Sequence, residues 1–263
     1  MAEESQAQGF ALAETALAAG FRLHAFETIG STNDAALDLA ASGAGPASVT
    51  RSWLVARAQT QGRGRHGRQW QSPPGNLYAS LLLIDEVMPR AAPQLGFVAG
   101  VALARALRRL SPDGAGIRLK WPNDILLDGA KLAGILAEGR ALPQESYAAV
   151  IGFGVNCQFC PPDLPYRAAA LIDTGAVRHR AEDVLSSLSE EMAHWLGRFQ
   201  QGFDAIRAEW LRLAAGIGGE IRVTTTARQF EGTFESIDAS GRLMLRDAQG
   251  VHVIEAGDVL LGH

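Results

Sequence analysis

Arginine and glycine residues alternate within one short segment of the chain, from Gln59 to Trp70. Arg63, Arg65 and Arg68 lie there among three glycines. An arginine carries a permanent positive charge on a planar fork that matches phosphate or carboxylate oxygens. Glycines such as Gly64 let the backbone turn and approach a ligand closely. Three like charges this close repel one another unless an anion lies between them. We therefore predict a loop that encloses an anion, rather than a solvated segment that touches RNA loosely.

Two lysine motifs follow this loop along the chain. The first is Lys120-Trp121-Pro122-Asn123-Asp124, and the second begins at Lys131 and runs to Ile135. Taken alone, the first is also typical of a turn in which an aspartate bonds its own backbone, and Lys131 of an exposed hairpin charge. In the functional interpretation, Lys120 neutralises phosphate, and Asn123 and Asp124 hold a nucleotide or hydrated Mg²⁺. Lys131 brings a carboxylate and a phosphate together.

Two weaker patterns complete the set of candidate residues. Ser31-Thr32-Asn33 is typical of a helix cap, and it also offers hydroxyl and amide groups to a polar ligand. Gly152-Phe153-Gly154-Val155-Asn156 permits a close approach of the backbone and ends in an amide able to bond a base or phosphate.

Hydrophobic periodicity predicts the elements that position these motifs. Strands are expected at 22–27, 53–58, 77–84, 117–121, 125–127, 131–138 and 147–156. A short helix or a frayed extension is expected within 1–20, and helices are expected from Ser31 to about Gly45 and over 94–110, 181–200 and 203–214. Beyond the glycine-rich stretch at 216–219, short strands alternate with turns and predict a small β-barrel of about five strands. The fold class is thus α+β, a mixed sheet packed with helices and then a barrel.

Composition narrows the function class. The chain of 263 residues has a net charge of −4, so its arginines are a local concentration and not a basic nucleic-acid footprint. No apolar run approaches the roughly 20 residues of a membrane span, and the acidic start (Glu3, Glu4) is the wrong sign for a secretory signal. We expect a cytoplasmic protein. Cys157 and Cys160 form one Cys-x-x-Cys without a second ligand pair, which favours reduced bystander thiols over a redox or zinc site.

These segments, in this order and spacing, resemble the biotin protein ligase family. The resemblance runs from residue 31 to residue 156, and the β-rich tail extends it to the end of the chain. The arginine loop is its most specific part. The resemblance implies a class II synthetase-like biotin/lipoate ligase fold at 22–215, after an extension at 1–21, and an SH3-like barrel at 216–263. Fewer than 25 residues precede the first strand, so we expect no winged helix and no repressor role.

The family's reaction supplies expected roles for individual residues. The carboxylate of biotin attacks the α-phosphate of ATP, and the biotinyl-5′-AMP then acylates a lysine of a biotin carboxyl carrier protein. Lys131 and Arg65 are the implied catalytic residues, with ATP and nucleotide-bound Mg²⁺ required and no metal site in the protein itself. The biotin site implied by motif match comprises Ser31, Thr32, Asn33, Gln59, Arg63, Gly64, Arg65 and Lys131. The nucleotide side comprises Arg68, Trp70, Lys120, Asn123, Asp124 and Asn156.

Two other functions fit parts of the pattern. A lipoate–protein ligase shares the fold and the adenylation chemistry, although the Arg-Gly-Arg loop and the barrel favour biotin. A non-catalytic nucleic-acid-binding module would use the loop and the barrel, but the acidic balance opposes it. The expected partner is a carrier domain that pairs a strand with an exposed sheet edge, and the chain itself is expected to be a monomer or a homodimer. The segment 157–172, where the family covers adenine, resembles the motifs least.

Overall fold

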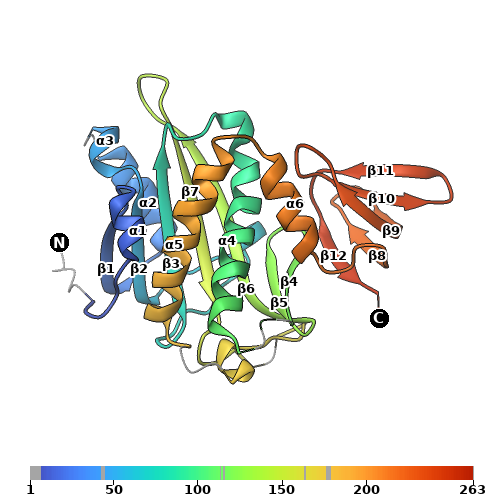
Figure 1. Ribbon diagram of the computed structural model, residues 1–263, viewed down its shortest axis with the longest axis horizontal. Helices are drawn as coiled ribbons and strands as arrows, with labels where there is room; N and C mark the ends of the chain where they lie inside the picture. Colours follow the sequence, from blue (N-terminus) through green and yellow to red (C-terminus); the bar gives the residue numbers. More distant parts are fainter. Residues whose placement is uncertain are drawn as a thin grey trace.

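A seven-stranded mixed sheet forms the centre of the larger part of the molecule (Figure 1). The computed structural model describes residues 7–42, 45–112, 114, 116–162, 164–175 and 179–262. Neighbouring strands follow the order β1-β2-β3-β7-β6-β5-β4. β1 and β2 are parallel, and every other neighbouring pair is antiparallel. The strands are β1 (Arg22–Ile29), β2 (Ser52–Gln59), β3 (Leu77–Ile84), β4 (Ile117–Lys120), β5 (Asp124–Leu127), β6 (Ala130–Ala141) and β7 (Tyr147–Val155).

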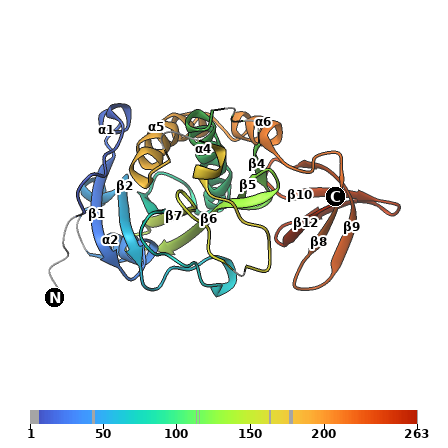
Figure 2. The same ribbon diagram turned by 90° about the horizontal axis from the view of Figure 1, so that it is seen from below.

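Helices cover the two faces of this sheet unequally (Figure 2). One face carries a layer of α1 (Glu14–Ala18), α4 (Leu95–Leu110), α5 (Ala181–Phe199) and α6 (Asp204–Leu213). The other face carries α2 (Thr32–Ala41), which packs on β2, β3 and β7. The short α3 (Pro46–Val49) and the 3-10 turns η1 (Arg65–Gly67), η2 (Pro89–Gln94) and η3 (Leu171–Thr174) lie in the connections. The rest of the second face is left for a site.

The N-terminal segment contains a short helix, as the sequence predicts. The helical spacing of Leu12, Ala16 and Ala19 before Gly20 predicts a short helix or a frayed extension, and α1 runs from Glu14 to Ala18. Gly9 has a φ of +96°, which a right-handed helix does not allow. Residues 1–6 lie outside the described part of the chain. The other predicted helices and strands are present within a few residues of their expected bounds.

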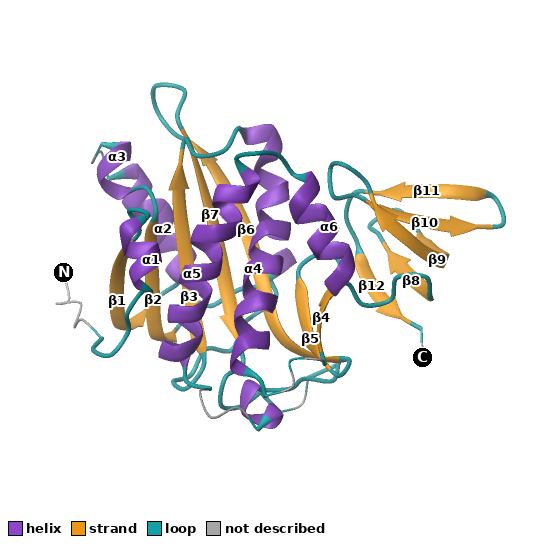
Figure 3. Cartoon of the chain, viewed as in Figure 1, coloured by secondary structure: helices purple, strands orange, loops and turns teal. Residues whose placement is uncertain are grey.

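The C-terminal part is a five-stranded antiparallel sheet, as predicted (Figure 3). Its order is β11-β10-β9-β8-β12. The strands are β8 (Glu220–Thr224), β9 (Gln229–Ile237), β10 (Leu243–Asp247), β11 (Gly250–Ile254) and β12 (Asp258–Leu261). Alternating exposed and buried residues in β8 show that one face packs on a core.

This small sheet is joined to the large one through buried aromatic side chains. The ring of Trp210 in α6 lies 6.5 Å from the ring of Phe234 in β9. The indole nitrogen of Trp121 donates to the carbonyl of Gly241 at 3.0 Å. Within the described residues no helix is long and apolar enough to span a bilayer.

Candidate functional site

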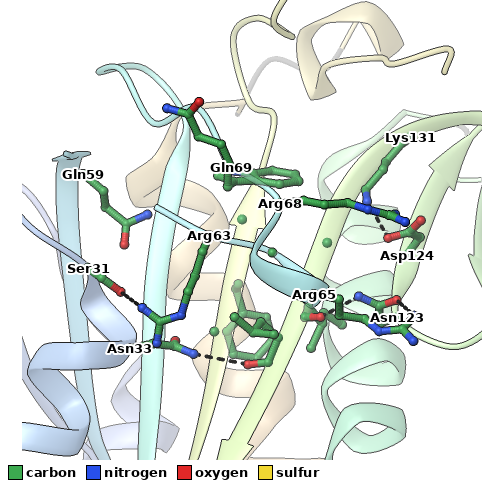
Figure 4. A pocket seen from close by; sticks show the side chains of 18 of the residues that line it. Ser31, Asn33, Gln59, Arg63, Arg65, Arg68, Gln69, Asn123, Asp124 and Lys131 are labelled. Carbon is green, nitrogen blue, oxygen red and sulfur yellow. Dashed lines mark hydrogen bonds and ion pairs between the residues drawn. The ribbon is translucent and has the colours of Figure 1, made fainter. Parts of the chain in front are cut away.

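A pocket opens on the second face of the large sheet, beneath the glycine–arginine loop (Figure 4). In β7, Ile151 and Phe153 pack into the helix-covered core. The side-chain period of a strand is two, so Gly152 and Gly154 point to the opposite face. The pocket is lined by Ser31, Thr32, Asn33, Gln59, Arg63, Gly64, Arg65, Arg68, Gln69, Trp70, Asn123, Asp124, Lys131, Gly134, Ile135, Leu136, Gly152, Phe153, Gly154, Tyr166 and Asp258.

Glycines in the floor make room for the loop. A Cβ atom added at Gly154 would lie 2.6 Å from the indole of Trp70, and one added at Gly134 would lie 3.3 Å from the same ring. Distances below 3.0 Å are not tolerated between such atoms, so the missing side chain at 154 is what lets Trp70 lie against the sheet. The loop is thereby held over the strands.

One end of the pocket is a rigid polar corner at the start of α2. Ser31 caps the helix by accepting a hydrogen bond from the Asp34 amide at 3.3 Å. The backbone N–H of Thr32 donates to the side-chain oxygen of Gln59 at 2.8 Å. Ser80, buried in β3, donates to the amide oxygen of Asn33 at 2.6 Å. Ser31, Thr32, Asn33 and Ser80 are buried and Gln59 is half-buried, and their hydrogen bonds form a fixed wall of hydroxyl and amide groups.

Arg63 is bound by two carboxylates of the protein itself. Its guanidinium donates to both oxygens of Asp34 at 2.7 Å, and to both oxygens of Glu138 at 2.9 and 3.1 Å. These hydrogen bonds, that to Asp34 being the largest effect, raise the pKa of Arg63. The same contact lowers the pKa of Asp34. Glu138 also accepts from the amide nitrogen of Asn33 at 2.6 Å. Arg63 therefore ties α2 to β6.

Arg65 and Arg68 are directed toward the C-terminal sheet. Arg65 donates to the side-chain oxygen of Asn123 at 3.2 Å and to the carbonyl of Gly257 at 3.4 Å. Arg68 is 2.5 Å from one oxygen of Asp258, and Arg65 is 3.8 Å from the other. Burial of Asp258 opposes its ionisation, but the two arginines outweigh it and lower the pKa of that carboxyl. A residue of β12 thus closes one side of the pocket.

Lys131 is fixed from three directions. Its ammonium lies 2.6 Å from Asp124, 5.6 Å from the ring centre of Trp70 and 5.4 Å from that of Tyr166. Two aromatic faces and one carboxylate thus surround the ammonium and hold it in place. Lys120 lies on the far side, 4.0 Å from the second oxygen of Asp124. Burial is the main cause that lowers the pKa of Lys120.

Most of the residues predicted from sequence meet in this pocket. Of the predicted residues, all of which the structure describes, Lys120 and Asn156 do not line the pocket. The amide of Asn156 is buried and donates to the carbonyl of Ala169 at 3.1 Å, so it holds the following loop instead. The predicted residues that share the pocket are Ser31, Thr32, Asn33, Gln59, Arg63, Gly64, Arg65, Arg68, Trp70, Asn123, Asp124 and Lys131.

Four residues whose side chains contact the predicted cations were not themselves predicted as site residues. Asp34 carries a signal, since it follows Ser31 at cap spacing, but its bond to Arg63 needs the fold. Glu138 and Asp258 lie 75 and 190 residues from their arginine partners, and no local pattern connects them. Tyr166 lies in the segment that resembles the family least, yet an exposed aromatic there is a usable signal.

The cysteine pair is remote from this chemistry. Cys157 is fully buried, and burial raises the pKa of its thiol to about 12. Both cysteines are free thiols. A buried, protonated thiol is unreactive, so Cys157 fits the prediction of a bystander, whereas Cys160 is partly exposed. Within the described part of the chain, no three His, Cys, Asp or Glu side chains are grouped to hold a metal ion.

The chain matches known families in two parts. Residues 29–156 match the Biotin/lipoate A/B protein ligase family, and residues 216–262 match the Biotin protein ligase C terminal domain. A biotin–[acetyl-CoA-carboxylase] ligase of Paracoccus denitrificans is 39% identical over 238 residues, which cover 88% of this chain and 97% of that protein. The chain belongs to the biotin protein ligase family.

Other biotin protein ligases are similar over nearly the whole chain. A biotin–[acetyl-CoA-carboxylase] ligase of Mycobacterium tuberculosis is 31% identical over 256 residues, covering 95% of this chain and 93% of that protein. The biotin protein ligase of Aquifex aeolicus, solved in complex with biotin and ATP, superposes with a TM-score of 0.77 at 24% identity. That superposition covers 92% of this chain and 99% of the Aquifex chain and shows a common fold.

Proposed function

We propose that this protein is an ATP-dependent ligase that activates biotin as biotinyl-5′-AMP and transfers the biotinyl group to a lysine of a biotin carboxyl carrier protein. One observation carries the proposal. Arg65, Arg68 and Lys131 meet in a single pocket, beside a wall of hydroxyl and amide groups. Membership of the biotin protein ligase family agrees with it.

In the first step the biotin carboxylate attacks the α-phosphorus of ATP, a carboxylate–phosphorus bond forms, and pyrophosphate leaves. The two reactants repel each other, so the protein must supply positive charge between them. Lys131, held by Asp124 and two aromatic rings, is positioned for that role. Arg65 and Arg68 would release Asp258 and bind the phosphate oxygens with their guanidinium groups instead. Little covalent help is needed, because positioning supplies most of the acceleration.

In the second step a neutral lysine amine of the carrier attacks the acyl carbon, and AMP leaves. The mixed anhydride between the steps is reactive toward water, so the loop over the pocket is expected to exclude it. Trp70 lies against Gly134 and Gly154, where its indole shields the floor. The polar corner at Ser31, Thr32 and Gln59 provides the donors and acceptors suited to the ureido ring of biotin.

Mg²⁺ enters this proposal bound to the phosphates of ATP. Such ions are usually held by one or two carboxylates together with substrate phosphates and water. Asp124 and Asp258 are the carboxylates that line the pocket. When bound, the ion would neutralise part of the phosphate charge, while Lys131 and the arginines orient the reacting groups.

The carrier needs a place to dock beside the pocket. β5 pairs with β6 only as far as Gly134, and β6 continues to Ala141, paired with β7 on one side and mostly exposed from Ala137 onward. This edge is suited to the addition of a strand. It would serve a carrier domain or a second copy of the chain, and sedimentation with and without carrier separates these two uses.

Biotin-dependent ATP–pyrophosphate exchange tests the first step. We expect exchange with biotin and not with lipoic acid, and loss of about 100-fold or more in Lys131→Ala, as for removal of one preorganised charged donor. Exchange with lipoic acid instead would favour a lipoate–protein ligase. Wild-type protein without exchange but with salt-sensitive affinity for RNA would support a nucleic-acid-binding module and overturn the proposal.

A further inference from the structure

A second groove lies between the large sheet and the C-terminal sheet, and the first proposal does not use it. Its walls come from η2, from β6 and from the turn that joins β9 to β10. The residues that matter for its chemistry are Arg65, Arg90, Asn123, Ala137, Arg242 and Glu255.

The charge of this groove is opposite to that of the protein as a whole. Three arginines and one carboxylate line it, while the chain carries a net charge of −4. Arg90 is exposed and makes no ion pair within the part of the chain that the structure describes. Glu255, the single acid, has an 81% exposed side chain and lies 3.8 Å from Arg242. Arg242 is also paired with Asp238 at 2.7 Å and Arg65 lies 3.8 Å from Asp258, so the positive charge free to act on a ligand is mainly that of Arg90. The groove therefore attracts an anionic ligand chiefly at Arg90.

The groove is built from fixed parts. Asp238 accepts hydrogen bonds from the backbone of Ser240 at 2.8 Å and of Arg242 at 2.9 Å, and from the Arg242 side chain at 2.7 Å. Gln94 in η2 donates to the carbonyl of Ala239 at 3.1 Å and so ties one wall to the other. A preformed site of this kind loses little entropy when a partner binds.

The groove also adjoins the ligand pocket directly. Arg65 and Asn123 line both, as do Ile135 and Leu136. Ala137, the next residue of β6, lies in the groove and begins the exposed strand edge. The hydrogen-bonded side chains of Arg65 and Asn123 separate the groove from the pocket. A side chain of a peptide bound in the groove could therefore extend past them into the pocket.

We propose that this groove binds an acidic segment of the carrier protein that flanks the acceptor lysine. This inference rests on the function proposed above. Arg90 and Arg242 would pair with carboxylates of that segment while the lysine enters past Arg65. Such rim charges act mainly on encounter and on salt dependence and contribute less to the chemical step.

Steady-state transfer to a biotin carboxyl carrier domain tests the inference. In Arg90→Glu we expect the KM for the carrier to rise about tenfold, with less dependence on salt, while biotin-dependent pyrophosphate exchange is unchanged. Arg242→Gln, which keeps a hydrogen-bonding group beside Asp238, should act in the same direction. The matched control is Arg198→Glu, the same charge reversal at an exposed position of α5, where no effect is expected.

A charge-swapped carrier sharpens the result. Replacing the acidic residues that flank its acceptor lysine by lysine should impair transfer by the wild-type protein and restore it with Arg90→Glu. Normal transfer by Arg90→Glu with intact exchange would overturn the groove assignment and leave the ligase activity standing. Absence of exchange in the wild type would remove the proposed function instead.

Discussion

At the scale of single residues, the cations of the pocket already have carboxylate partners in the protein. Arg63 is the clearest case, because both terminal nitrogens of its guanidinium group are hydrogen-bonded to carboxylates, those of Asp34 and Glu138. An arginine so occupied has little capacity left for a substrate anion. We infer that Arg63 positions α2 against β6, and that Arg65 and Lys131, each with a single close carboxylate, exchange partners with the ligands.

Replacing Arg63 by methionine tests this positioning role. The change leaves two carboxylates facing each other without a cation, and we expect a loss of about 1–3 kcal/mol in the free energy of unfolding, at the lower end because the side chains are partly exposed. Urea titration followed by circular dichroism measures it. Arg198→Met is the control. Unchanged stability together with lost biotin affinity would instead assign Arg63 to the substrate.

The same contact predicts a pH dependence. The hydrogen bond from Arg63 lowers the pKa of Asp34 below its ordinary 3.8. A depressed carboxyl stabilises the fold above its unfolded pKa, and this contribution is lost as the pH falls through the folded value. Between about pH 5 and pH 3 the wild type should therefore lose more unfolding free energy than Asp34→Asn. Parallel curves for the two proteins would contradict the assignment.

At the scale of elements, β7 supplies the floor on which the arginine loop rests. Ile151 and Phe153 anchor the strand in the core, while Gly152 and Gly154 leave the other face bare. On this second face Ala148 and Val150 pack under α2, and only the end of the strand at Gly152 and Gly154 is open to the loop. Gly154 is needed because it has no side chain, which leaves room for the Trp70 indole. Its backbone angles are not the reason, since its φ is not positive.

Gly154→Ala is therefore expected to damage binding more than stability. The new Cβ atom would lie 2.6 Å from the Trp70 indole and push the loop away from the sheet. We expect at least a tenfold weaker affinity for biotin and ATP, measured by calorimetry, with a small change in Tm. Gly197→Ala is the control, because its Cβ atom meets nothing within 4 Å and alanine favours a helix. Equal affinities in the two variants would refute the steric role.

Sequence patterns revealed the elements and the cations of the site, but not the carboxylates that hold them. Lys131 begins one predicted strand and Asp124 directly precedes the neighbouring one, so their meeting follows from the hairpin between these strands. Glu138 reaches Arg63 only through the order β3-β7-β6, which periodicity does not encode. Asn156 is the converse case: a polar residue at a strand end predicts a ligand contact, while in the structure its amide donates to the backbone of Ala169 and it does not line the pocket.

At the scale of the whole molecule, the two sheets share one continuous core. Phe234 and Ile237 of β9 belong to the same buried cluster as Trp210 and the residues of α4. Polar contacts cross the same junction, since Arg207 of α6 donates to the carbonyl of Ile237 at 2.6 Å. The C-terminal sheet also places Asp258 in the pocket. Loss of this junction would therefore disturb the site as well as the fold.

Phe234→Ala tests whether the two sheets unfold as one unit. Phe234 is 1% exposed and packs near Trp210, so its removal should cost about 3–5 kcal/mol through lost transfer energy and a cavity. Because the core is shared, tryptophan fluorescence and circular dichroism should report one transition at a lower urea midpoint. Val251→Ala on the exposed edge of β11 provides the control and should shift neither probe. Two separated transitions in Phe234→Ala would contradict this and show that the C-terminal sheet unfolds alone. In that partly unfolded state the large sheet would hold the arginine loop without the contacts of Asp258.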